Sequence, residues 1–204
     1  PTRRSSDLNA GNVGRSRGNL SQTMADGEPT RLDKPAMDLL PFPGISHQTV
    51  AAVRGIRAVT ASTSASFADS VRGTEPSRQP FAAIDGDPLT EWHSSSFGGP
   101  KGEWLEVELD TPRMVREVTL LPVYDLRVGW PITRVRISTD AGVIDHDVAA
   151  GRGPQVLSTA PGLTGRVRLT VLSVLGDRTT GNAGIAELTI PGVTPHREIG
   201  RAHV

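Results

Sequence analysis

The chain has 204 residues, no cysteine, and 22 basic against 22 acidic residues. A formal net charge of zero argues against a nucleic-acid partner, whose binding surface is strongly basic. The lack of cysteine excludes disulfides and thiolate metal sites. No apolar run approaches the ~20 residues of a membrane span, and no signal peptide opens the chain. We therefore expect no direct membrane insertion by these residues.

Composition changes along the chain and predicts one domain with flanking segments. Residues 1–8 and 198–204 resemble translated sequencing adapters, so we exclude them from the fold prediction and expect the natural protein to extend further. Residues 9–54 are polar and rich in glycine, which predicts a linker or the edge of a preceding domain. The domain is predicted at residues 55–193, and residues 194–204 are predicted to be a tail made largely of adapter-like sequence.

Short runs that alternate between apolar and polar residues predict β-strands, and no segment has a helical stripe of useful length. Turn residues separate the runs, for example at residues 110–112 and 140–142. Such a pattern is typical of an all-β antiparallel sandwich or barrel. Trp92 and Trp104 are predicted to lie in its core. The predicted strands are residues 56–62, 105–109, 118–120, 133–137, 167–171 and 185–190.

Residues 83–92 gather oxygen donors within a few positions. Asp85, Asp87 and Thr90 surround the turn residue Gly86, and Trp92 closes the segment. This density of oxygen ligands favours a hard cation, and the tryptophan would fix the loop to a core. The alternative is that Asp85-Gly86 is only a turn.

Five segments resemble, in order, motifs of the discoidin-like family, the galactose-binding-like β-sandwich modules related to the C-type domains of coagulation factors. The first is the A-x-D-G-x-x-x-T-x-W signature. The resemblance implies a jelly-roll fold and a non-catalytic, carbohydrate-binding function. Animal members usually carry a disulfide that this chain lacks, which favours the bacterial carbohydrate-binding branch. The matching segments are residues 83–92, 102–109, 115–120, 135–142, and the closing pair of residues 167–169 and 184–188.

Residues 181–193 are similar to the discoidin-like segments of mycobacterial-type α-(1→3)-arabinofuranosyltransferases, large membrane enzymes that build cell-wall arabinan. This resemblance implies a parent glycosyltransferase with catalysis outside the fragment. It places the module on the extracytoplasmic face of a bacterial envelope. Two alternatives stay open: a module of a secreted glycoside hydrolase, and an adhesion module that binds protein.

The discoidin-like resemblance also implies a structural Ca²⁺ that ties the first loop to the last strand. In the family, the first loop aspartate, the threonine and the glutamate of the last strand bind it, together with loop carbonyls. In this chain the metal candidates are Asp85, Asp87, Thr90 and Glu187. The alternative for Glu187 is a solvated strand residue.

The loop at residues 124–130 is the predicted sugar-binding site. It combines aromatic rings, which stack on sugars, with polar side chains that bond hydroxyl groups. The expected ligand is a polysaccharide, arabinan or galactan. The alternative is that Trp130 only packs the loop onto the sheet edge. The candidate residues are Tyr124, Asp125, Arg127 and Trp130, with His93, Arg178 and Asn182 at the same end.

No catalytic residue is predicted. Asp145, His146 and Asp147 form the densest polar cluster, but consecutive strand residues point to opposite faces. The cluster is therefore interpreted as the polar edge of a hairpin.

Overall fold

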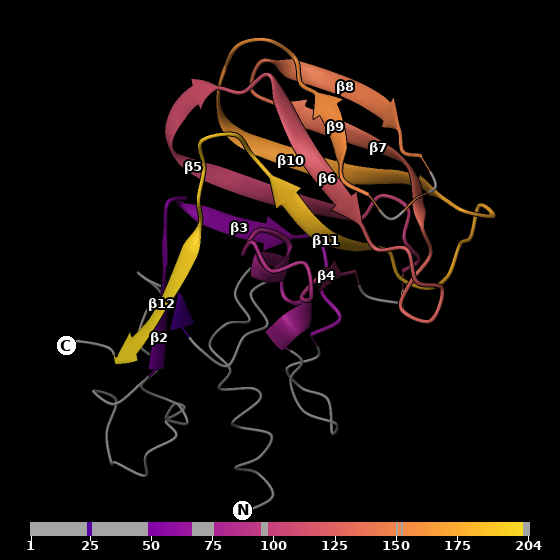
Figure 1. Ribbon diagram of the computed structural model, residues 1–204, viewed down its shortest axis with the longest axis horizontal. Helices are drawn as coiled ribbons and strands as arrows, with labels where there is room; N and C mark the ends of the chain where they lie inside the picture. Colours follow the sequence, from indigo (N-terminus) through magenta and orange to yellow (C-terminus); the bar gives the residue numbers. More distant parts are fainter. Residues whose placement is uncertain are drawn as a thin grey trace, which may run out of the picture.

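Two antiparallel sheets pack face to face in this computed structural model, which describes residues 24–25, 49–66, 76–94, 98–149, 151 and 153–201 (Figure 1). One sheet has five strands in the order β3-β5-β10-β7-β8, and the other has four in the order β4-β11-β6-β9. The predicted all-β antiparallel sandwich is confirmed.

The strands of the five-stranded sheet are β3 (Ala58–Ala61), β5 (Trp104–Met114), β7 (Ile132–Thr139), β8 (Gly142–Asp147) and β10 (Leu163–Val174). Those of the four-stranded sheet are β4 (Trp92–His93), β6 (Glu117–Pro122), β9 (Gln155–Ser158) and β11 (Gly184–Thr189). Two short 3-10 helices, η3 (Pro76–Arg78) and η4 (Pro80–Ala83), precede β4. None of the described residues forms a helix long and apolar enough to span a membrane.

Alternation along the strands builds the core between the two sheets. In β5, Leu105 and Val107 are fully buried, while Glu106 between them faces outward and accepts a hydrogen bond from Arg168. The buried Trp92 confirms one core prediction. The prediction for Trp104 is wrong. It precedes the inward-facing Leu105, so its ring lies on the outer face, half-buried, with the Arg168 guanidinium 4.1 Å from its centroid.

The predicted turn at residues 110–112 is also wrong, because β5 continues through it to Met114. The register against β10 shifts between Thr164 and Arg166, which leaves this part of β5 unpaired. A proline without an N–H group is tolerated there because no ladder hydrogen bond is required. The strand β9 was not among the predicted strands, and β8 was predicted only as the hairpin edge that contains Asp145, His146 and Asp147.

The polar cluster in β8 has the predicted alternation. Asp145 pairs with Arg136 on the neighbouring strand, with Nε and Oδ1 2.7 Å apart. His146 points the other way and lies 2.8 Å from the carbonyl oxygen of Ser158 in β9. His146 therefore connects the edges of the two sheets.

A small third sheet lies beside the sandwich, in the order β1-β2-β12 (Figure 1). Its strands are β1 (Met24–Ala25), β2 (Thr49–Arg54) and β12 (His196–Arg201). The first two lie in the predicted linker, and β12 lies in the predicted tail. Residues 1–8 lie outside the described residues.

Candidate functional site

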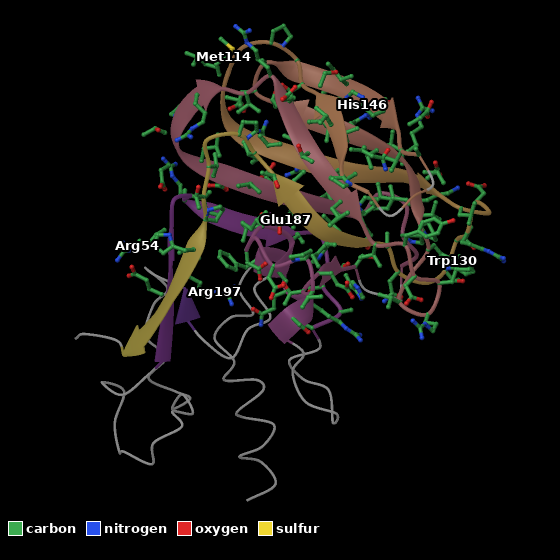
Figure 2. The ribbon with its side chains drawn as sticks, in the orientation of Figure 1. Arg54, Met114, Trp130, His146, Glu187 and Arg197 are labelled. Atoms are coloured by element: carbon green, nitrogen blue, oxygen red, sulfur yellow. The ribbon has the colours of Figure 1, made fainter. Side chains whose placement is uncertain are left out.

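Two regions hold the candidate residues (Figure 2). We call residues 83–92, which lead from η4 into β4, the cation loop. We call residues 124–130 and 175–183, at the end of the sandwich where Trp130 lies, the rim loops. Glu187 lies on β11, next to the cation loop.

The cation loop is shaped by hydrogen bonds between near neighbours. The backbone N–H of Asp87 donates to Asp85 Oδ1 at 2.9 Å, and that of Leu89 donates to Asp87 Oδ1 at 3.0 Å. Gly86 has a φ of 78°, a left-handed conformation that favours glycine. The Asp87 carboxylate is thus engaged in the turn, while its carbonyl oxygen turns toward Thr90 at 3.0 Å.

Oxygen atoms crowd around the hydroxyl group of Thr90. Its Oγ1 lies 3.1 and 2.9 Å from the two carboxylate oxygens of Asp85, 3.0 Å from Asp87 O and 3.4 Å from Ala82 O. A hydroxyl group has one proton and can donate to only one acceptor. The remaining contacts bring oxygen against oxygen, an arrangement that a cation would stabilise.

Glu187 contributes a half-buried carboxylate to the same place. Its Oε2 accepts a hydrogen bond of 3.1 Å from the backbone N–H of Gly86. Burial raises the pKa of Glu187 to about 7, with the negative charges of Asp85 and Asp87 contributing and that hydrogen bond acting in the opposite direction. A pocket of about 230 Å³ opens beside Asp85 and Glu187.

The donor set fits a hard cation. Within the described ranges, no three His, Asp or Glu side chains come together as a metal cluster. The cation loop instead offers the Asp85 carboxylate, the Thr90 hydroxyl and the Asp87 carbonyl. Glu187 on β11 adds a carboxylate and Ala82 in η4 adds a carbonyl. Ca²⁺ accepts such mixtures of carboxylate, hydroxyl and carbonyl oxygens.

The rim loops are joined through Trp130. Its backbone N–H donates to Asn182 O at 2.7 Å, and its indole Nε1 donates to Thr180 O at 3.0 Å. The ring is partly buried against the core. The guanidinium of Arg178 lies over it, 4.5 Å from the centroid. The structure thus brings Trp130, Arg178 and Asn182 together, and Arg178 covers a face of the ring.

Glycines permit this close approach of the loops. A Cβ atom on Gly181, whose φ is 94°, would lie 2.6 Å from Trp130 Nε1. A Cβ on Gly129 would lie 2.9 Å from Asn182 O, and one on Gly99 would lie 2.2 Å from Thr179 O. The loops can therefore close only with glycine at these positions.

His93 lies beneath the surface. It is 1% exposed, and burial, aided by the charge of Arg78, lowers its pKa to about 4. Its Nε2 lies 2.9 Å from Glu91 Oε1, within ion-pair distance, yet neither ring nitrogen has a hydrogen-bond partner. We regard the contact as a close approach without a salt bridge, because the imidazole is neutral at pH 7.

The remaining candidates lie on the loop at residues 124–130. Asp125 and Arg127 pair with each other, with Arg127 Nη2 2.6 Å from Asp125 Oδ2. Tyr124 is 37% exposed, and Leu126 beside it is 64% exposed. This loop therefore presents apolar side chains and a neutralised charge pair.

Sequence reasoning did not single out Glu91 and Gly181. Burial raises the pKa of Glu91, the charge of Arg78 lowers it, and the charge of Asp125 on a rim loop raises it slightly. Its position between Thr90 and Trp92 was the available signal. Nothing local in the sequence marks Gly181 as the contact of Trp130, because they are far apart along the chain.

Comparison with known proteins identifies the family. The family model described as arabinofuranosyltransferase D, third carbohydrate binding module, matches residues 57–202. An alpha-(1->3)-arabinofuranosyltransferase of Mycobacterium tuberculosis (strain ATCC 25618 / H37Rv) is 31% identical over 145 residues, 71% of this chain and 10% of that protein. Its counterpart from Mycolicibacterium smegmatis (strain ATCC 700084 / mc(2)155) is 28% identical with the same coverage. The chain thus spans about a tenth of these curated relatives.

Solved structures agree on the fold. The cryo-EM structure of an arabinofuranosyltransferase from Mycobacteria has a TM-score of 0.72 and 22% identity, covering 91% of this chain and 15% of that one. The module CBM32-3 from a family 31 glycoside hydrolase of Clostridium perfringens has a TM-score of 0.54 and 23% identity, covering 67% and 90%. The chain belongs to the family of the third carbohydrate-binding module of arabinofuranosyltransferase D.

Proposed function

We propose that this module holds a parent arabinofuranosyltransferase on cell-wall arabinan or galactan, at the outer face of a bacterial envelope. Family membership supports a carbohydrate ligand, and the names of the relatives support the parent activity. Catalysis would lie outside these residues. Weak binding is enough for such a role, because a tethered module raises the local concentration of its catalytic domain on the polymer.

The closure of the two rim loops around Trp130 and Arg178 carries the proposal for the binding site. Hydrogen bonds fix the ring from the opposite loop, and Tyr124 adds a partly exposed aromatic side chain on the same rim. Rigid aromatic groups with a few polar donors are what saccharide sites require.

Binding of wild-type protein and Trp130→Ala to arabinan and galactan, measured by affinity electrophoresis, tests the site. We expect the variant to lose binding while circular dichroism shows an intact fold. Wild-type protein that retains no saccharide on a glycan array would reject the function. Undiminished binding by Trp130→Ala would show that the saccharide binds outside the rim loops.

We further propose that Ca²⁺ binds in the cation loop and has a structural role. Asp85, Thr90 and Glu187 would bind it, with the carbonyls of Ala82 and Asp87. The bound ion would supply positive charge between two carboxylates and so connect the first loop to β11. The crowding of oxygens at Thr90 supports this proposal.

A further inference from the structure

Arg178 is a cationic side chain that is held in place by an aromatic ring and not by a carboxylate. Its guanidinium lies over the Trp130 ring and its side chain is exposed. Among the described residues no carboxylate pairs with it. Even the adjacent Asp177 is engaged elsewhere, in an ion pair with Lys101.

Several other arginines in the described part of the chain pair with carboxylates. Arg168 Nε lies 2.8 Å from Glu106 Oε2, and Arg127 on the facing rim loop pairs with Asp125. Arg178 is instead held over an aromatic ring, as Arg197 is over Phe81. Arg197 is partly buried and donates to Gln79, whereas Arg178 is exposed. The further arginines paired with carboxylates are Arg134, Arg136 and Arg166.

The backbone around Arg178 keeps it over the ring. Gly176 has a φ of 76°, and a Cβ atom there would lie 3.3 Å from Arg178 Nε. Asp177 is the one described non-glycine residue with a positive φ, 52°. The loop therefore folds the arginine back onto Trp130, and Thr180 and Asn182 hold Trp130 in turn. Such a side chain loses little further freedom when it binds a ligand.

A stacked guanidinium presents its N–H groups along its edge. That planar fork matches the two oxygens of a carboxylate or phosphate group, and such charge-assisted pairs are about twice as strong as neutral hydrogen bonds. A neutral hydroxyl group would leave the charge uncompensated.

We propose that the rim binds an anionic saccharide, with Arg178 holding its acidic group. This inference rests on the proposed function and adds to it, because the saccharide held at the rim loops would carry an acidic group besides its neutral arabinose or galactose units. The acidic group is a carboxylate, as in a uronic acid, or a phosphate ester on a sugar.

Calorimetric titration with saccharides that differ only in charge tests the inference. Polygalacturonate is compared with its fully methyl-esterified form, and galactose 6-phosphate with galactose. We expect the wild-type protein to prefer a charged form by about 10-fold or more, and salt to weaken that preference. The pair that shows the preference separates carboxylate from phosphate.

Three variants complete the test. Arg178→Gln should lose the preference, and Arg178→Lys, which keeps the charge but not the fork, should retain part of it. Arg116→Gln removes an equal charge from an exposed position just before β6, at the end of the sandwich that Met114 marks in Figure 2, and should keep the full preference.

Equal binding of charged and neutral saccharides by the wild-type protein would overturn this inference while leaving the carbohydrate-binding function intact. A preference that survives in Arg178→Gln, or that Arg116→Gln also abolishes, would likewise overturn it. Failure to bind any saccharide, charged or neutral, would reject the function and the inference together.

Discussion

The cation loop and the rim loops are assembled in different ways. Hydrogen bonds within the cation loop connect residues two to five positions apart, as from Asp87 to Asp85 and from Thr90 to Asp85. The rim depends on contacts between distant residues, such as Trp130 and Thr180, which are 50 positions apart.

This difference matches the two proposed roles, which are to hold the module together and to bind a ligand. The cation loop points its oxygens inward around Thr90 and meets β11 through Glu187. The rim turns its charge outward on Arg178. Changes in one region should therefore leave the other largely intact, unless they affect the core beneath both.

Trp92→Ala should have the largest effect and should damage both regions. Trp92 is fully buried, its indole N–H donates to Thr63 O at 2.9 Å, and its strand connects the cation loop to β11. Truncating a buried tryptophan costs about 3–5 kcal/mol of unfolding free energy. Urea denaturation measures the loss, and the conservative Trp92→Phe should lose less. A loss below about 1 kcal/mol would contradict the central position of this ring.

Calcium should stabilise the cation loop, and Glu187→Gln should remove the response. At 100 times its Kd, a ligand adds about 2.7 kcal/mol, which for a domain of this size raises Tm by on the order of 5–10 °C. Thermal melts with Ca²⁺ or with a chelator give the measurement. Glycan binding in the presence of chelator should remain. Glu117→Gln, at an exposed position, should respond like the wild-type protein, and an unchanged response in Glu187→Gln would exclude Glu187 as a ligand.

Gly181→Ala should damage only the rim. The added methyl group would meet Trp130 Nε1 at 2.6 Å, at a φ of 94°. We expect a destabilisation of about 1–3 kcal/mol and loss of saccharide binding, with the calcium response preserved. Gly102→Ala is the matched control, because its φ is also positive, 82°, and a Cβ there has no neighbour within 4 Å. Equal effects of the two substitutions would mean that the contact with Trp130 is unimportant.

The smallest predicted effect is a pH dependence of the calcium-free protein. Glu187 has a folded pKa of about 7 against 4.5 for the free group, so the folded state retains a proton that the unfolded state loses in this range. The contribution of Glu187 to the stability of the folded state is fully present below about pH 4.5 and is lost as the pH rises to about 7. The effect is modest because solvent screens a half-exposed group.

Comparison of Tm between wild-type and Glu187→Gln in chelator isolates this contribution. His93 has the opposite effect between about pH 4 and pH 6.5, because its lowered pKa makes stability rise with pH. Both proteins contain His93, so its effect cancels in the comparison. The variant should match the wild-type protein near pH 4.5 and exceed it at pH 8. The reverse order at pH 8 would contradict the raised pKa.

Strands with a strict alternation were predictable from the sequence, and those without it were not. Leu105 and Val107 alternate with outward glutamates, and period two settles their orientation. The strand β9 has four residues, with Val156 63% exposed, so it offers too few apolar positions to mark a buried face. Trp104 was predicted to lie in the core because tryptophan is a large apolar residue. The alternation already indicated the outer face, because the next residue, Leu105, faces inward.

The all-β class, the turn at residues 83–92 and the family could be read from the sequence, because each depends on residues at short, regular spacing. Asp85, Thr90 and Trp92 lie within one turn-rich segment, and short-range hydrogen bonds are enough to place them. The contacts within the rim could not be read from the sequence and follow from the folded chain. Whether Trp130 is open or covered depends on Arg178 from another loop, and on a glycine that lets that loop approach. Contacts between segments that are so distant in the sequence depend on how the whole sandwich packs, and a local sequence pattern does not predict that packing.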